Sequence, residues 1–307
     1  MDETDKKIAA FITAIFLLII AYGGYRWARG ALSEKENGLT VEEGDTVEVE
    51  YVGWLSDPRI YGSERRVFDT NIEKVATDNI TYPKTLTYKY HEPKPFKFTV
   101  GKGQVIKGWD KNIIGMKEGE SAKWVIPPEQ GYQPRLESLL YSLNRTENVP
   151  VYENLSFSEY TRIYKQPEPE IGDQITHAIW GWPAEVISVT DEQVTIFNKP
   201  AVGETYDSLW GWSITVTDIE NADNPWKDTI AVLNNAEVGD LVPTQDLAGL
   251  LQDINDIKST QQKEQKQVSD GIVVDTTPDK ITIDFNSEVY GQTLVFEVTV
   301  LKITKAT

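Results

Sequence analysis

The sequence predicts an α+β protein. An antiparallel β-sheet wraps around a short helix, a mainly β segment with tandem hairpins and one amphipathic helix is inserted into it, and a single transmembrane helix comes first. Three observations lead to this prediction. The stretch from Pro95 to Tyr132 has the pattern of strand, turn, short helix, turn and strand. Three similar segments occur between residues 179 and 294, and residues 8 to 22 form an unbroken apolar run.

The central stretch alternates in a way that is typical of half-buried strands. Phe96 and Phe98 alternate with polar residues before two glycines break the pattern. Residues 105 to 114 then carry apolar side chains at helical spacing, so a short helix is expected to lay one face on a sheet. Residues 121 to 126 form a second strand, which a pair of prolines ends.

Four motifs in this stretch occur together and in order: PFKF, GKGQVIKGWD, GMKEGE and IPPE. In these motifs the chain resembles an FKBP-type peptidyl-prolyl cis-trans isomerase. The flanking segments VEVEYVGWL, VFDT and TLVFEVTVLKI resemble the family's first long strand, its F-D-[ST] segment and its closing strand. The resemblance covers roughly residues 40 to 133 and 290 to 304, and it implies an FKBP-like antiparallel sheet wrapped on a short helix.

The resemblance also implies an enzyme that needs no nucleophile, cofactor or metal. The barrier to prolyl isomerisation is the loss of amide resonance, about 18 to 20 kcal/mol. An apolar pocket with aromatic walls suits this reaction, because it accepts the proline ring and removes the water that would solvate the planar carbonyl.

Position by position, the family motifs imply which residues form this pocket. Asp69 would place a carboxylate near the twisting carbonyl, and the backbone N–H of Ile106 and the hydroxyl of Tyr132 would donate hydrogen bonds to ligand carbonyls. Trp109 would form the floor under the proline ring. The implied substrate-binding residues are Tyr51, Phe68, Phe96, Val105, Trp109 and Phe296. Aromatic residues on strands are more often core than pocket, which is the interpretation for Phe98 and Trp124.

The sequence departs from the simple family pattern after Tyr132. Gln133 replaces the usual glycine, and residues 134 to 288 stand where simple members have a short flap. This resembles the insert-in-flap arrangement of some bacterial and archaeal members, whose extra domain binds unfolded chains. Substrate preference and the affinity for macrolide inhibitors, which the resemblance names as further ligands, depend on this change.

The inserted segment contains an internal repeat. The copies span residues 179 to 205, 209 to 241 and 270 to 294, and each has a strand, a polar turn, a second strand ending in Asn and a glycine turn. Three hairpins are therefore predicted. Residues 244 to 268 place Leu and Ile side chains on one helical face, which predicts an amphipathic helix with a polar tail. At least one tryptophan of each WGW pair, Trp180 and Trp182 or Trp210 and Trp212, is interpreted as packing between hairpins, with ligand binding as the alternative.

The apolar run at residues 8 to 22, extended to Tyr25, is nearly long enough to span a bilayer. An uncleaved anchor is favoured, and a cleavable signal peptide is the alternative. Basic residues on both sides leave the positive-inside rule undecided. A single N-terminal anchor usually exports the chain on its C-terminal side, so the soluble part is expected outside the cytoplasm.

Charge and composition exclude several function classes. The net charge of −18 over 307 residues would repel the phosphate backbone, so no nucleic-acid partner is expected. Without cysteine the chain has no disulfide, no thiol nucleophile and no cysteine-based zinc site. His91 and His177 are the two histidines and lie far apart in sequence, which argues against a histidine-rich metal site.

The combined hypothesis is a membrane-anchored isomerase that assists the folding of proteins with Xaa-Pro bonds, with client binding by the insert. One competing hypothesis is a catalytically weak or inactive client-binding chaperone with the barrel as scaffold, and another is a structural surface protein. The predicted divisions are the anchor at 1–30, a linker at 31–38 and the first part of the isomerase domain at 39–133. The insert follows at 134–288, and the closing strand lies at 289–307.

Overall fold

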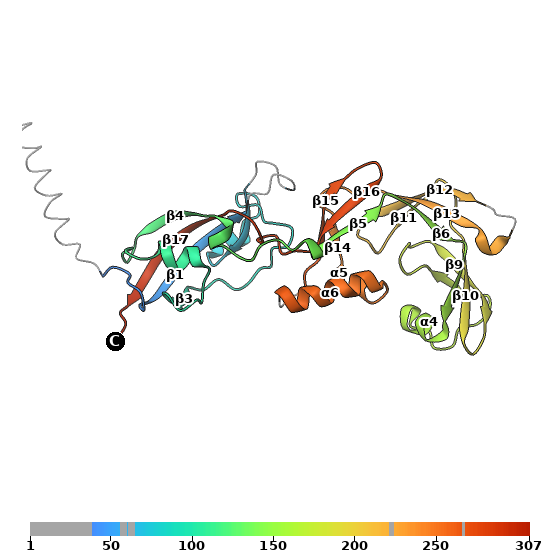
Figure 1. The fold of residues 1–307 in the computed structure, drawn as a ribbon, viewed down its shortest axis with the longest axis horizontal. Helices are drawn as coiled ribbons and strands as arrows, with labels where there is room; N and C mark the ends of the chain where they lie inside the picture. Colours follow the sequence, from blue (N-terminus) through green and yellow to red (C-terminus); the bar gives the residue numbers. More distant parts are fainter. Residues whose placement is uncertain (1–38, 56–59, 61–64, 221–223, 266–267) are drawn as a thin grey trace, which may run out of the picture. The chain divides into compact units, whose positions relative to one another are not determined.

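The computed structural model describes residues 39–55, 60, 65–220, 224–265 and 268–307, and this part of the chain is mainly β (Figure 1). The predicted anchor and linker, residues 1 to 38, lie outside the described residues. No helix within the described ranges is long and apolar enough to cross a membrane. The described chain falls into two compact units. The first holds the residues up to Glu50 with Pro95–Ala122 and Val298–Thr307, and the second holds Tyr51–Lys94 and Lys123–Glu297.

A five-stranded antiparallel sheet carries the family motifs. Its strand order is β2-β1-β17-β4, and β3 also pairs with β1. The strands are β1 Thr46–Leu55, β2 Arg66–Thr70, β3 Phe96–Thr99, β4 Ser121–Ile126 and β17 Leu294–Thr304. The mainly β architecture predicted from the sequence is confirmed.

The short helix of the central motif is α3, Lys107–Asn112, and it is shorter than the predicted 105 to 114. Ile106 stands at its N-cap with an extended backbone, so the helix begins only after it. Gly115 has a φ of +86°, a left-handed conformation that favours glycine and stops the helix. Trp109 and Ile113 are buried, which fixes the face that α3 presents to the sheet.

The Tyr, Thr and Pro content of residues 71 to 94 predicts an extended bulge. The structure corrects this prediction for Glu73–Thr77, which form a short helix, α2. Val75 and Ala76 of α2 are buried, and Val75 packs with Val52 and Val67 of the sheet. Burial against the strands selects the helix over the weak local preference for extended structure.

The chain between β4 and β17 folds into three four-stranded antiparallel sheets with strand orders β7-β10-β9-β8, β11-β12-β13-β6 and β14-β15-β16-β5. At the centre of each lies one of the three predicted hairpins: β9–β10, β12–β13 and β15–β16. The hairpin strands are Pro183–Val189, Gln193–Asn198, Ser213–Glu220, Thr229–Asn234, Gly271–Thr276 and Lys280–Asp284. The strands β8, β11 and β14 are Gln174–Thr176, Thr205–Asp207 and Leu241–Val242.

The remaining strand of each sheet comes from one continuous stretch at the start of the insert. This stretch holds β5 Leu140–Asn144, β6 Thr146–Pro150 and β7 Tyr152–Ser156. The three strands pair with the hairpins in reverse order: β5 with β16, β6 with β13, and β7 with β10. Short 3-10 turns occur at Pro128–Gln130, Glu137–Leu139 and Pro225–Lys227.

The asparagine that ends each repeat holds this stretch to its hairpin. The side-chain amides of Asn198, Asn234 and Asn286 donate to the backbone carbonyls of Pro150, Asn144 and Leu136, at 3.0, 3.1 and 3.0 Å. All three asparagines are buried. Because a buried amide is costly unless it is paired, these side chains help to fix which strand joins which hairpin.

Tryptophans support two of these asparagines. Trp182 Nε1 donates to Asn198 Oδ1 at 2.9 Å, and Trp212 Nε1 donates to Asn234 Oδ1 at 3.0 Å. Each WGW pair is stacked, with ring centroids 5.7 and 5.8 Å apart. All four WGW tryptophans are buried. The packing interpretation of the WGW motifs is therefore confirmed.

The helices of the insert differ from the prediction. The predicted single helix at 244 to 268 is two, α5 Thr244–Ala248 and α6 Gln252–Gln265, with a break that begins at Gly249. Both lie between β14 and β15, where the other two copies have a WGW loop, so the third repeat matches the others loosely. The sequence prediction missed α4, Phe157–Tyr164, which begins with a capping box formed by Ser156 and Glu159.

Candidate active site

The second unit gathers five of the predicted site residues around β1, β2 and β17. The ring centroid of Phe296 lies 6.4 Å from that of Tyr51 and 5.5 Å from that of Phe68. A Cβ atom at Gly53 would lie 2.8 Å from atoms of both phenylalanine rings, so glycine is required for them to close over β1. Phe296 is only 2% exposed. It therefore packs against the rings of Tyr51 and Phe68, and little of its own surface is accessible to a ligand.

The carboxylate of Asp69 is the polar centre of this group. The antiparallel pairing of β1 and β2 places Asp69 opposite Gly53 of β1, the strand that also carries Tyr51. The Tyr51 hydroxyl donates to Asp69 Oδ2 at 2.7 Å, and His91 Nε2 lies 2.9 Å from Oδ1. The Asp69 side chain is 36% exposed. The carboxylate is thus held on both oxygens and still open to a ligand.

His91 is a residue that the sequence reasoning did not place in the site. Its signal was weak, because the histidine lies 22 positions from Asp69 in the sequence. The chain returns there from α2, and Asn71 fastens it: its side-chain amide donates to the carbonyl of Lys94 at 3.0 Å, and its Oδ1 accepts from the backbone N–H of Tyr51 at 2.7 Å.

The two site tyrosines stay protonated over the physiological pH range. Burial, followed by the negative charge of Asp69, raises the pKa of Tyr132 to about 12. Burial and the same carboxylate raise the pKa of Tyr51 well above its ordinary value. Tyr132 is nevertheless 39% exposed as a residue. Both hydroxyls are therefore neutral hydrogen-bond donors, and Tyr132 is open to a ligand.

The first unit holds the other four predicted residues, on β3, on α3 and in the turn before α3. Phe96 and Phe98 stack at 5.6 Å, and the Trp109 ring meets them edge-on at 6.2 and 5.9 Å. Phe98 is 2% exposed and belongs to the core, as predicted, whereas Phe96 is 36% exposed. Val105 and Ile106 are half-buried in the turn that leads into α3. The roles assigned to these residues by resemblance remain predictions.

Comparison with known proteins places this chain in one class. The profile of the family described as FKBP-type peptidyl-prolyl cis-trans isomerase matches residues 38–157. A relative from Methanocaldococcus jannaschii, named short-type peptidyl-prolyl cis-trans isomerase, is 32% identical over 185 residues, which are 60% of this chain and 97% of the relative. The chain belongs to the FKBP-type peptidyl-prolyl cis-trans isomerase family, and its enzyme class is peptidyl-prolyl cis-trans isomerase.

Eukaryotic relatives match a shorter part of the chain. Human peptidyl-prolyl cis-trans isomerase FKBP2 is 38% identical over 93 residues, which are 30% of this chain and 48% of that protein. Arabidopsis thaliana peptidyl-prolyl cis-trans isomerase FKBP53 is 37% identical over 98 residues, 32% of this chain and 15% of that protein. The archaeal match is twice as long in this chain and therefore extends into the insert.

Proposed function

We propose that this chain isomerises Xaa-Pro bonds in unfolded or partly folded proteins, that its insert binds these clients, and that an N-terminal helix anchors it to a membrane. The observation that carries the catalytic part is the Asp69 carboxylate, held by Tyr51 and His91 and open to a ligand beside the Tyr132 hydroxyl. The family resemblance supports the role of Trp109 as the floor under the proline ring.

The residues divide the work of lowering the rotational barrier. Twisting the prolyl C–N bond localises the lone pair on nitrogen and removes the amide resonance of about 18 to 20 kcal/mol. Trp109 and the aromatic walls hold the ring away from water, which stabilises the planar amide by hydrogen bonds to its carbonyl. The Asp69 carboxylate orients the twisting carbonyl electrostatically, and the Tyr132 hydroxyl holds a neighbouring carbonyl of the substrate.

Replacing Asp69 with alanine should lower kcat/KM for a prolyl tetrapeptide on the order of tenfold, equivalent to about 1.4 kcal/mol of transition-state stabilisation. Folding should change little, because the side chain is partly exposed. Protease-coupled or NMR exchange rates measure the activity. Glu92→Gln is the matched control, since it removes an exposed carboxylate next to His91 and should isomerise like the parent. A folded Asp69→Ala variant with parental activity would refute the assignment.

Client binding by the insert is supported by its surface. Within the described ranges, each of the three sheets ends in strands with an unpaired edge, and such edges accept extended chains. Exposed apolar side chains lie on the same segment, including Ile171, Val202 and Trp226 at 69%, 56% and 58% exposure. An unfolded client offers both extended backbone and apolar side chains, so this surface complements it.

Membrane anchoring rests on the apolar run at residues 8 to 22. We expect residues 32 to 307 to lie outside the cytoplasmic membrane, because a single N-terminal span usually exports the chain on its C-terminal side. Protease added to intact cells should then digest the soluble part, with a cytoplasmic protein as the control for lysis. Digestion that occurs only after lysis would reverse the orientation.

A further inference from the structure

A cavity of about 440 Å³ begins at the candidate site and continues along the insert. Asp69, Phe68 and Tyr132 line one part of it, and Gln265 and Ser269 line another. All of these residues belong to the second compact unit. The volume falls in the usual range of ligand sites, about 300 to 1,000 Å³. A chain bound at Asp69 therefore has room to continue toward the end of α6.

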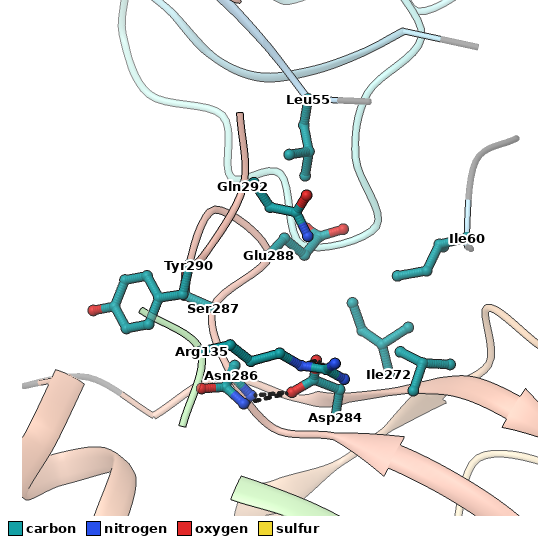
Figure 2. A pocket seen from close by; sticks show the side chains of 11 residues that line it. Leu55, Ile60, Arg135, Ile272, Asp284, Asn286, Ser287, Glu288, Tyr290 and Gln292 are labelled. Atoms are coloured by element: carbon teal, nitrogen blue, oxygen red, sulfur yellow. Dashed lines mark hydrogen bonds and ion pairs between the residues drawn. The ribbon is translucent and has the colours of Figure 1, made fainter. Parts of the chain in front are cut away.

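The far wall of the cavity is fixed by hydrogen bonds. Arg135 Nε and one of its terminal nitrogens each lie 2.7 Å from Asp284 Oδ2. Asp284 Oδ1 in turn accepts from the side-chain amide of Asn286 at 2.7 Å. Figure 2 shows these residues around a smaller neighbouring pocket, with the Tyr290 side chain pointing away from Ile272. These contacts hold residues 286 to 290, part of which lines the cavity.

A contact between two loops closes another side. The backbone N–H of Thr87 donates to Glu288 Oε2 at 3.0 Å, and the Thr87 hydroxyl donates to the same oxygen. Thr87 and Glu288 both line the cavity. The carboxylate of Glu288 is thus already bound to the protein, which leaves the polar groups nearer α6 to meet a ligand.

Gln265 is a buried polar residue in this wall whose side chain lacks a partner among the described residues. It is the last residue of α6 and only 7% exposed, yet among the described residues neither atom of its amide group has a hydrogen-bond partner. One turn earlier, the Nε2 of Gln261 is satisfied, because it donates to the carbonyls of Phe285 and Ser269 at 2.8 and 3.0 Å, whereas its Oε1 has no partner among the described residues. Burying an unpaired amide is unfavourable, so a partner supplied by a ligand would be a net gain.

We propose that Gln265 is a substrate-binding residue that hydrogen-bonds the backbone of the client chain beside the prolyl bond, an inference that rests on the proposed function. A primary amide offers one acceptor and a donor pair, which match the N–H and C=O of an extended peptide. Gln265 lines the cavity, so its amide can meet a peptide that lies there. The contact involves only the backbone of the client and none of its side chains, which suits an enzyme that accepts many client sequences.

The test compares peptide binding by the full chain in detergent micelles. Replacing Gln265 with leucine keeps the volume and removes the unpaired amide, so the melting temperature should not fall. The affinity for a fluorescent eight-residue peptide with a central Ala-Pro bond should fall roughly three- to tenfold, the range for one net hydrogen bond. The matched control is Gln262→Leu, which changes an exposed glutamine of the same helix and should bind like the parent.

Peptides in which one amide at a time is replaced by an ester give a second measurement. One position beside the proline should weaken binding to the parent by a similar factor, and that penalty should disappear in the Gln265→Leu protein. Equal affinities of parent and Gln265→Leu, or a loss that Gln262→Leu reproduces, would overturn the assignment. If Gln265→Leu fails to fold, the ester series is measured with the parent protein alone. In that case the assignment is overturned if none of the ester substitutions weakens peptide binding. A parent that binds in this manner without isomerising the peptide would refute the proposed function and leave the subsite standing.

Discussion

Replacing Trp109 with alanine should give the largest single-residue loss, in both activity and stability. The indole is 4% exposed and lies edge-on against Phe96 and Phe98. Truncation of a large buried aromatic side chain typically costs about 3 to 5 kcal/mol. It would also remove the floor on which the proline ring is proposed to rest. Denaturant titration measures the stability loss, and prolyl peptide exchange measures activity at temperatures where the variant is still folded.

Trp124→Ala is the control for this experiment. Trp124 lies on β4 of the five-stranded sheet and is 7% exposed. Its truncation should therefore cost a free energy of unfolding similar to that of Trp109→Ala. The folded Trp124→Ala protein should keep most of its activity, because no pocket role is assigned to this residue. Equal activity of the two folded variants would show that Trp109 acts only as core.

Replacing residues 135 to 288 with a short Gly-rich link should separate isomerisation of a peptide from isomerisation of a protein. The chain leaves and returns at adjacent points, because the N–H of Gly291 donates to the carbonyl of Gln133 at 3.0 Å. The sheet of β1, β2, β3, β4 and β17 contains no strand of the deleted segment within the described ranges. Activity on a prolyl tetrapeptide should therefore stay within about tenfold of the parent, the contribution assigned to one hydrogen bond.

Proline-limited refolding of a whole protein should slow far more in the same deletion. Weak client binding by the insert raises the local concentration of prolyl bonds at the site. An effective concentration of this kind can strengthen overall binding by a factor of about 10² or more. Adding the insert as a separate chain is the control, since an unlinked binder should not restore the rate. Equal losses on peptide and protein would mean that the insert builds the pocket wall and does not recruit the client.

The parts of the fold that sequence reasoning predicted are those with a strong local pattern. The motif from Pro95 to Tyr132 and the period-two alternation of the three repeats each specify an element within a few residues. The break at Gly249 divides a helix whose apolar spacing continues unbroken on both sides, so periodicity alone did not show it. The capping box of Ser156 and Glu159 was present in the sequence and would have indicated α4.

The parts that could not be predicted depend on contacts between distant residues. No periodicity brings His91 to Asp69, since that approach depends on how the segment after α2 is fastened by Asn71. Similarly, the unpaired amide of Gln265 becomes meaningful only when α6 and β2 are seen to line one cavity. Sequence motifs therefore identified the expected pocket of the family, and the three-dimensional arrangement was needed to find the features that this chain adds to it.

The reverse pairing of β5, β6 and β7 imposes an order on synthesis. These strands leave the ribosome before any of their partners exist. Asn144, for example, pairs with Lys280, which is synthesised 136 residues later. In each sheet of the insert the hairpin can form locally, whereas the strand that completes it has to be kept unpaired until then. The closing strand β17 of the barrel comes after all of them. The barrel sheet is thus completed only after the whole insert has been translated, and until then it presents open strand edges.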